Sequence, residues 1–318
     1  MKVLITGACG FIGFHYSLFL LNKGFNICGV DDLNNYYSVS LKKERLNILR
    51  KNKKFKFHKI STHNFKKMEY IFKKNKFDLI INFAAQAGVR LSFLNQDVYF
   101  NRNIVGFYNI LKLCKIYKIK KVIYASSSSV YGNSKSKKFS LNDNSDNQES
   151  FYAATKKINE IIANTYSKKF KINIIGLRFF TVYGPYGRPD MAYFKFTDKL
   201  FKNKSIELYN SGNHSRDFTY IEDAVKMIFQ IQKSKKKISH QIYNIAAGKN
   251  EKLLKLINVI EKLSGKKFKI KKLKKQVGDV DDTHADISLT KKTTRYSPKY
   301  NLNLGMKKFI DWYKSRSW

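Results

Sequence analysis

Two residues one helical turn apart, Tyr152 and Lys156, have the types and the spacing that proton transfer needs. Residues four apart in an α-helix share one face, so the Lys ammonium group would lie beside the Tyr ring. A phenol with its ordinary pKa of about 10 is a poor base at neutral pH, but a nearby positive charge favours the phenolate. That phenolate can take a proton from a hydroxyl group. Such a pair is also common by chance, so its sequence context must decide whether it is catalytic.

A run of four serines, Ser126 to Ser129, follows an apolar strand pattern at 121–125 and leads into Val130, Tyr131 and Gly132. Their hydroxyl groups can hydrogen-bond an oxygen that reacts nearby. Tyr152 follows about twenty residues later, inside a helical pattern. This context favours a catalytic role for the Tyr/Lys pair.

Three glycines, Gly7, Gly10 and Gly13, lie between a strand pattern at 2–6 and a helical pattern. A tight turn of this kind needs residues without side chains, so that backbone N–H groups at the helix N-terminus can approach a pyrophosphate. A purely structural turn would also explain three glycines. The spacing therefore indicates a dinucleotide site only if a second feature supports it.

That second feature is Asp31, which with Asp32 ends the next predicted strand, 26–30, and lies 18 residues beyond Gly13. An acidic side chain there can accept hydrogen bonds from an adenosine ribose. A carboxylate repels a 2′-phosphate, and no Arg lies within the next several residues, so the pattern favours NAD over NADP. Two adjacent aspartates can also form a turn or a helix cap.

The elements that must position these residues alternate between strand and helix, which predicts an α/β fold. We expect a Rossmann-type doubly wound parallel sheet with a smaller C-terminal substrate-binding cap. The predicted strands are 2–6, 26–30, 54–60, 78–83, 121–125 and 172–178, and the predicted helices are 11–23, 39–51, 64–75, 97–117 and 151–169. A loop at 181–191 holds two of the three prolines, and a helix near 220–233, a strand at 241–246 and a closing helix from about Gly305 follow. We expect an NAD-binding domain at 1–178, to which 217–246 returns, and a cap at 179–216 and 247–318.

The net charge is +39, from 62 Lys and Arg against 23 Asp and Glu, and could suggest a nucleic-acid partner. Only nine of the basic residues are Arg, the type that reads bases and phosphates in pairs of hydrogen bonds, while 53 are Lys spread along the chain. Asn, Ile, Phe and Tyr are also abundant, so we interpret the charge as an A/T-rich codon bias on solvated faces. The field would still speed the arrival of polyanionic small substrates.

Several classes of site and location are not expected. No apolar run approaches the roughly 18 residues of a membrane span, and Met1 leads straight into a strand, so we expect a cytoplasmic protein without a membrane or nucleic-acid partner. Cys9, Cys28 and Cys114 have no metal-ligand spacing and are expected as reduced core thiols. The six histidines form no ligand set, so no metal is expected.

Long motifs resemble the extended short-chain dehydrogenase/reductase superfamily, of the NAD-dependent epimerase/dehydratase type, and within it the UDP-glucuronate 4-epimerases. The resemblance covers essentially the whole chain. Beyond the glycine turn, the serine-rich strand end and the Tyr152/Lys156 pair, it is carried by Phe83–Arg90, Tyr124–Tyr131, Arg178–Met191, Arg216–Asp223 and Gly278–Val280.

The resemblance implies roles for individual residues. Tyr152 would be the base, Lys156 would also bond the nicotinamide ribose, and either Ser127 or Ser129 would bond the reacting O4. The implied NAD site consists of Gly7, Gly10, Phe11, Ile12, Gly13, Asp31, Asn34, Ala84, Ala85 and Lys156. The implied UDP-sugar site consists of Arg90, Ser128, Thr181, Arg188, Arg216 and Asp279, with Arg216 and Asp279 at the UDP portion and Thr181 and Arg188 at the sugar carboxylate.

The resemblance also implies a homodimer through the helices at 97–117 and 151–169, where Ile104, Phe107, Ile158 and Ile162 are apolar. It further implies a role in nucleotide-sugar metabolism for polysaccharide biosynthesis. One stretch departs from the family: an acidic residue usually contacts adenine after the third strand, and here Ser61, Thr62 and His63 occupy that place.

The fate of the 4-keto sugar distinguishes the epimerases from their relatives. Dehydratases resemble one another in an Asp-Glu pair before the Val-Tyr-Gly motif, and decarboxylases have a Glu there, whereas this chain has Ser128 and Ser129. Without an ionisable group, hydride return to the opposite face of C4 is the remaining outcome. Four alternatives stay open: a UDP-glucose or UDP-N-acetylglucosamine 4-epimerase, a non-catalytic NAD-binding protein, an RNA-associated protein, and, for Arg188, a phosphate contact or a salt bridge within its loop.

Overall fold

A computed structural model describes residues 1–134, 136–234, 240–274 and 282–316. The chain divides into two compact units. Unit 1 comprises Met1–Ser134, Asp143–Phe179 and Gln232–Tyr243, and unit 2 comprises Lys135–Asn142, Phe180–Ile231 and Asn244–Trp318. The assignment of cofactor and substrate binding to separate domains, with a boundary at 178, stays a prediction.

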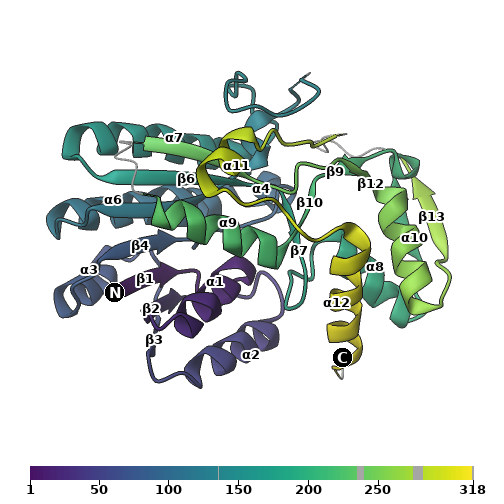
Figure 1. Cartoon of the computed structure of the whole chain (residues 1–318), viewed down its shortest axis with the longest axis horizontal. Helices are drawn as coiled ribbons and strands as arrows, with labels where there is room; N and C mark the ends of the chain where they lie inside the picture. The colour runs from purple at the N-terminus through teal and green to yellow at the C-terminus, as the bar shows by residue number, and fades with distance from the viewer. Residues whose placement is uncertain (135, 235–239, 275–281, 317–318) are drawn as a thin grey trace. The chain divides into compact units, whose positions relative to one another are not determined.

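A seven-stranded sheet forms the centre of unit 1, in the order β11-β6-β5-β4-β1-β2-β3 (Figure 1). Strands β1 to β6 pair in parallel, which confirms the predicted doubly wound sheet. The strand order reverses between β1 and β4, and ligands bind beside the carboxyl ends of strands at such a switch point. The bounds are β1 (Lys2–Thr6), β2 (Asn26–Asp31), β3 (Phe55–Lys59), β4 (Leu79–Asn82), β5 (Lys121–Ser127), β6 (Asn173–Phe179) and β11 (His240–Ile245).

The central strands are apolar on both faces because helices cover both. Val3, Leu4 and Ile5 of β1 are fully buried. Side chains of α3, α6 and α7 form one core cluster with alternate residues of the strands, while α1 contacts β1 and β2 and packs on α2 (Figure 1). The helices of unit 1 are α1 (Phe11–Asn22), α2 (Val39–Arg50), α3 (Phe65–Lys74), α4 (Leu91–Leu94), α5 (Gln96–Tyr99), α6 (Gly106–Ile116) and α7 (Phe151–Phe170).

The prediction of a single α-helix at 97–117 is wrong in the middle of this range. A π-helical turn, Phe100–Val105, separates α5 from α6. Its residue Asn103 is buried and exchanges hydrogen bonds with the backbone of Gln86, at 2.7 and 3.1 Å. These partners lie outside the helix, so no helical periodicity could reveal the wider turn.

Unit 2 holds more regular structure than the sequence patterns predicted. Two strand pairs are parallel, β7 with β10 and β8 with β13, and β9 pairs with β12 in antiparallel fashion. The bounds are β7 (Thr181–Tyr183), α8 (Ala192–Phe201), β8 (Ile206–Tyr209), β9 (Ser215–Arg216), β10 (Phe218–Tyr220), α9 (Ile221–Lys233), β12 (Glu251–Lys252), α10 (Leu253–Ser264), β13 (Ile270–Leu273), α11 (Ser288–Thr294) and α12 (Leu302–Lys314).

The closing helix begins at Leu302 rather than near Gly305. Asn301 caps it, since its side chain accepts a hydrogen bond of 2.9 Å from the amide of Leu304. Gly305 lies inside the helix, where a Cβ would come within 2.1 Å of the Tyr183 hydroxyl. Close packing, and not helix termination, therefore explains this glycine.

All three cysteines are buried, as predicted, and burial raises the pKa of each thiol. Within the described ranges, no helix is long and apolar enough to cross a membrane.

Candidate active site

The glycine turn brings the carboxyl ends of β1 and β4 together. Gly7 has a φ of +69°, and a Cβ there would lie 2.7 Å from the amide nitrogen of Ala84. A Cβ on Gly13 would lie 2.0 Å from the carbonyl oxygen of Gly7. Side chains at either position would break the turn, so both glycines are required by close approach.

The N-terminus of α1 offers backbone donors at this turn. Gly10 precedes the helix, and no side chain among the described residues caps it. Its first turn contains Phe11 and Ile12 and no acidic residue. Uncapped N–H groups at the positive end of a helix are suited to a pyrophosphate.

Asp31 lies at the end of β2, in the position predicted for the adenosine ribose. Its carboxylate is buried and accepts hydrogen bonds from the amides of Cys9, at 3.0 Å, and Leu33, at 2.9 Å. Burial raises the pKa of Asp31, while the hydrogen bond from Leu33 lowers it. Asp31 therefore both forms a local turn and presents a carboxylate at the strand end, so the two interpretations of this residue are compatible.

Asn34 and the alanines of the predicted cofactor site are held by their neighbours. The Asn34 side chain donates to Asp32, at 2.8 Å, and accepts from Lys42, at 2.9 Å. The amide of Ala84 donates to the Thr6 hydroxyl at 3.2 Å, and Ala85 follows it beyond the end of β4.

The stretch that departs from the family, Ser61 to His63, packs against α6. A Cβ on Gly106 would lie 2.4 Å from the Thr62 hydroxyl, and the Asn109 side chain donates to the carbonyls of Thr62 and His63, at 3.1 and 3.0 Å. The contact between this stretch and adenine stays a prediction.

Lys156 is not a surface residue, since only 3% of it is exposed. Its ammonium group donates to the carbonyl oxygen of Ala125 in β5, at 2.9 Å, and lies 5.9 Å from the centre of the Tyr152 ring. Burial lowers the pKa of Lys156 to about 8, so most of the amine still carries its charge at pH 7. The structure therefore places a buried cation between Tyr152 and the strand that ends in the serines.

Tyr152 lies in the first turn of α7, and Ser150 caps this helix through a 3.1 Å hydrogen bond from the amide of Ala153. The Tyr152 ring packs edge-on against Tyr99, with 6.2 Å between ring centres. Tyr99 is itself held by its hydroxyl, which donates to the carbonyls of Ala87 and Gly88. The catalytic candidate therefore sits on a capped helix and against a fixed ring.

The four serines differ in their partners. The Ser127 hydroxyl donates to that of Ser129, at 3.1 Å, and also accepts from the Ser129 amide, at 3.2 Å. Ser128 and Ser129 belong to a short 3₁₀ turn, Ser128–Tyr131. Ser126 instead donates to the buried carboxylate of Glu160, at 2.6 Å. Ser127 and Ser129 therefore form a hydroxyl pair, and Ser126 is committed to the core.

Two supports of this site were missed by the sequence analysis. Arg178 and Glu160 form a buried bidentate ion pair, with distances of 2.9 and 2.8 Å, that joins β6 to α7. Asn103 of the π-helical turn donates to the Thr155 hydroxyl at 3.0 Å, which joins that turn to α7. All these partners are distant in sequence, so no local pattern signals them.

The predicted substrate residues lie in both units. Arg90 precedes α4 in unit 1 and is exposed. In unit 2, Thr181 begins β7, and its amide donates to the carbonyl of Asp217, at 3.2 Å. Arg216 ends β9, and its guanidinium group donates to the carbonyl of Ser215, at 2.8 Å. Asp279 lies outside the described residues.

Arg188 forms a bidentate ion pair with Asp190 inside its own loop, at 3.1 and 2.5 Å. This is the loop salt bridge that the sequence left open as an alternative. It also shows that the guanidinium fork can take a carboxylate in this loop. A sugar carboxylate would have to share the Arg188 guanidinium group with Asp190 or displace Asp190 from it.

Asp217 holds the strands around Arg216. Its buried carboxylate accepts hydrogen bonds from the amides of Ala247 and Gly248, at 2.8 and 2.9 Å, and from Lys249. Burial raises the pKa of Asp217 to about 6, against these hydrogen bonds, which lower it. This role of Asp217 was not predicted from the sequence.

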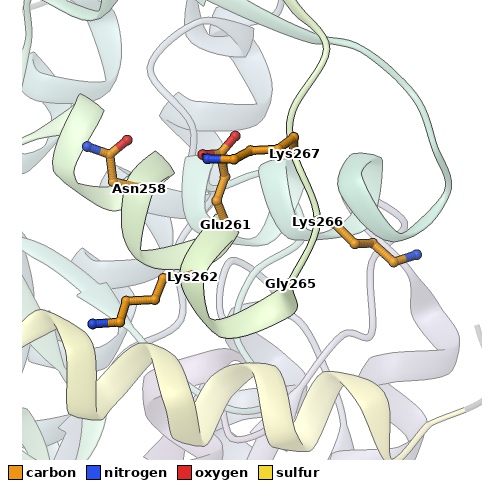
Figure 2. A pocket seen from close by; sticks show the side chains of 6 residues that line it. All are labelled: Asn258, Glu261, Lys262, Gly265, Lys266 and Lys267. Carbon is orange, nitrogen blue, oxygen red and sulfur yellow. The ribbon is translucent and has the colours of Figure 1, made fainter.

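A hollow of about 340 Å³ lies at the end of α10 in unit 2, and Figure 2 shows its lining. Lys267 points toward Glu261, to which it donates at 2.8 Å, while Lys262 and Lys266 point away. Of the predicted site residues that the structure describes, none lines this hollow.

Residues 3–246 match the model of the NAD dependent epimerase/dehydratase family. The chain belongs to this family. For an NAD dependent epimerase/dehydratase, the glycine turn has a physical reason: its backbone passes so close to itself and to Ala84 that Gly7 and Gly13 leave no space for a Cβ. The N-terminus of α1 that follows this turn, uncapped by any described side chain and with no acidic residue in its first turn, fits the dinucleotide.

Individual relatives are similar along nearly their whole length. The chain is 42% identical to Protein CapI of Staphylococcus aureus, over 98% of each protein. It is 40% identical to the UDP-glucuronate 4-epimerase of Thermodesulfobacterium geofontis, over 98% of this chain and 95% of that protein. The crystal structure of the UDP-glucuronic acid 4-epimerase from Bacillus cereus, in complex with UDP-glucuronic acid and NAD, superposes with a TM-score of 0.94 at 34% identity, over 99% of both chains.

Proposed function

We propose that the protein is an NAD-dependent UDP-glucuronate 4-epimerase that interconverts UDP-glucuronate and UDP-galacturonate. The observation that carries this proposal is the buried Lys156 ammonium group beside Tyr152, at the end of a serine-bearing strand. The chain is also 40% identical, over nearly its full length, to a protein named for that activity.

The proposed chemistry begins at Tyr152. The Lys156 charge stabilises the phenolate, which takes the proton of the sugar 4-hydroxyl, and Ser127 or Ser129 hydrogen-bonds the same oxygen. NAD held at the glycine turn would supply the acceptor for the hydride of C4 and the donor for its return. After the 4-keto sugar has rotated to present its opposite face, Tyr152 gives the proton back to O4. The reaction is redox-neutral overall.

Ser128 and Ser129 favour epimerisation over the reactions of related enzymes. Dehydration or decarboxylation would be assisted by a carboxylate before Val130, and these positions carry only hydroxyl groups. The 4-keto sugar then has no ionisable neighbour at that place to direct it elsewhere.

In this proposal, Arg188 and Thr181 hold the sugar carboxylate. 4-Keto-glucuronate is a β-keto acid, which loses CO2 when the bond from C5 to the carboxylate aligns with the carbonyl π system. A planar guanidinium fork can hold that bond near the carbonyl plane through two parallel hydrogen bonds. Arg216 and Asp279 would bind the UDP portion, and Arg90 and Ser128 would complete the site.

The proposal includes a homodimer, a cytoplasmic location and a role in polysaccharide biosynthesis. Support for the dimer comes from α6 and α7, where Tyr108, Ile158 and Ile161 are 41%, 36% and 56% exposed. Of the other residues first considered for this contact, Ile104 and Ile162 are half-buried and Phe107 is buried in the core of unit 1, so Phe107 cannot meet a partner.

The test is incubation of the purified protein with UDP-glucuronate, UDP-glucose and UDP-N-acetylglucosamine, each followed by chromatography of the products. We expect UDP-galacturonate from the first at a far higher rate than any product from the other two. Preferred turnover of UDP-glucose or UDP-N-acetylglucosamine would assign a different epimerase, and no turnover of any sugar would overturn the proposal.

A further inference from the structure

A cation from a distant part of the chain lies at the end of β2. Arg102, in the π-helical turn, forms an ion pair with Asp32, with 3.1 Å between Nη2 and Oδ2. The same guanidinium group donates through Nη1 to the side chain of Gln86, at 2.9 Å. Arg102 therefore links the segments that follow β2 and β4, the two strands that flank β1.

A second cation supports the same loop. Lys42 of α2 is buried, and its ammonium group donates to the backbone carbonyl of Asn34, at 2.6 Å, as well as to its side chain. The end of β2 and the loop after it thus carry two carboxylates, Asp31 and Asp32. Three cations contact this segment: Lys42, Arg102, and Arg45, which donates to the Tyr37 hydroxyl at 2.7 Å.

The position of Arg102 bears on the choice between NAD and NADP. Enzymes of this fold that use NADP commonly place an Arg near the ribose to hold its 2′-phosphate. The sequence shows no Arg soon after Asp32, but the fold brings in Arg102 from 70 residues further along the chain. Its fork is engaged by Asp32 on one side and by Gln86 on the other.

We propose that Arg102 is a latent 2′-phosphate contact, and that Asp32 determines specificity for NAD by occupying it. The inference rests on the proposed placement of the adenosine ribose at the end of β2. In the native chain, a 2′-phosphate would meet two carboxylates, and its natural partner is already paired. Without the Asp32 charge, the Arg102 guanidinium group is free to donate a charge-assisted hydrogen bond to a phosphomonoester.

The experiment compares Asp32→Asn, Arg102→Met and the double variant with the native protein. Asn keeps the side-chain oxygen that accepts from the Asn34 amide, at 3.1 Å, but it loses the charge and replaces the oxygen that pairs with Arg102 by an NH2 group. Each protein is titrated by calorimetry with NAD and NADP. The same titrations with adenosine 5′-monophosphate and adenosine 2′,5′-bisphosphate test the phosphate contact without the nicotinamide and without turnover.

We expect Asp32→Asn to improve the affinity for NADP relative to NAD by at least about tenfold, the scale of one hydrogen bond to a charged group. Adding Arg102→Met should return the ratio to within about threefold of the native value. Asp146→Asn is the matched control, because it removes one negative charge and breaks another 3.1 Å ion pair of unit 1, with Lys157. The control should leave the ratio unchanged.

Two results would overturn the inference. One is no gain for NADP in Asp32→Asn or, if that variant does not fold, in Asp32→Ser. The other is a gain that persists without Arg102, which would show that only the removed repulsion matters. Failure of the native protein to bind NAD would instead contradict the proposed cofactor site, so the two failures can be told apart.

Discussion

At the scale of single residues, burial changes what each functional group can do. Lys156 loses contact with water, so the pKa of its amine falls to about 8, while its hydrogen bond to Ala125 fixes the position of the charge. Ser126 and Ser127 are neighbours in sequence, yet one donates to Glu160 and the other to Ser129. Residue type therefore determines the available chemistry, and local contacts determine which member of a run performs it.

The first prediction concerns the hydroxyl of Tyr152. In Tyr152→Phe the ring can still pack against Tyr99, so NAD affinity should stay within about twofold, but the proton acceptor is lost. We expect the epimerisation rate to fall at least ~10²-fold, the scale of general-base catalysis. Chromatographic rates and NAD titrations on the same sample measure both quantities. Turnover close to that of the native enzyme would exclude Tyr152 as the base.

The second prediction concerns fidelity and Arg188. If Arg188 holds the sugar carboxylate in the carbonyl plane, Arg188→Ala should allow some turnovers to end in loss of CO2. Decarboxylation leaves the hydride on the cofactor, so UDP-4-keto-pentose and NADH should accumulate relative to UDP-galacturonate. Product chromatography and the absorbance of the reduced nicotinamide measure this ratio.

Arg188→Lys is the control for that experiment, because it keeps the charge and removes the planar fork. We expect its loss of fidelity to lie between those of the native enzyme and Arg188→Ala. A variant that is slower but makes neither NADH nor pentose would show that Arg188 only binds substrate, and that Thr181 or another group restrains the carboxylate.

At the scale of elements, α7 organises the site because its faces have different partners. One side carries Tyr152 and Lys156 toward the end of β5, and the same helix carries Glu160 into a buried ion pair with β6. The strand beyond β6 in the sheet, β11, adds His240, which stacks on Tyr124 and shares a 3.1 Å hydrogen bond with its hydroxyl. The edge strand of the sheet thus carries a half-buried titratable group.

The third prediction follows from His240. Burial lowers its pKa to about 4, so between about pH 6.5 and 4 the unfolded chain takes up a proton that the folded chain does not. Stability should therefore fall as the pH falls through this window, by at most about 1.4 kcal/mol per pH unit from this residue. In urea unfolding, His240→Gln should show a shallower loss of stability from pH 6.5 to 4.5.

His63→Gln is the matched control, since His63 is exposed and follows β3 in the same unit. Its unfolding free energy should keep the native dependence on pH. Equal slopes for His240→Gln and the native protein would show that acid sensitivity arises elsewhere.

At the scale of the whole molecule, charge and exposed apolar surface decide how copies of the chain meet. A net charge of +39 opposes association unless an apolar surface compensates. On α7, Ile158 and Ile161 lie three residues apart and so share one face, and on the adjacent α6 Tyr108 contacts Tyr166 of α7. This apolar strip is the surface on which the proposed dimer would form.

The fourth prediction tests that strip. Ile161→Lys places a charge at a position that is 56% exposed, so the monomer should fold normally while a dimer through α6 and α7 should dissociate. Leu254→Lys, at a 40% exposed position of α10 in unit 2, should leave the dimer intact. Light scattering at micromolar concentration gives both masses. A strictly monomeric native protein would refute the proposed dimer.

Much of unit 1 could be predicted because its signals are local. Apolar strands alternate with amphipathic helices, and the glycine turn needs residues without a Cβ, so the order of β1 to β6 and the position of the dinucleotide turn follow from neighbours in the chain. The signal for Tyr152 and Lys156 is also local, because two residues four apart in a helix lie on the same face.

Only the tertiary structure revealed the partners that tune these groups. Asn103 meets Thr155 across 52 residues, Glu160 receives a hydrogen bond from Ser126 across 34, and Asp32 pairs with Arg102 across 70. Short elements of unit 2 such as β9 and β12 depend in the same way on pairing with distant strands. Local periodicity carries no information about such pairs, because the distance between their atoms is set by packing and not by the number of residues between them.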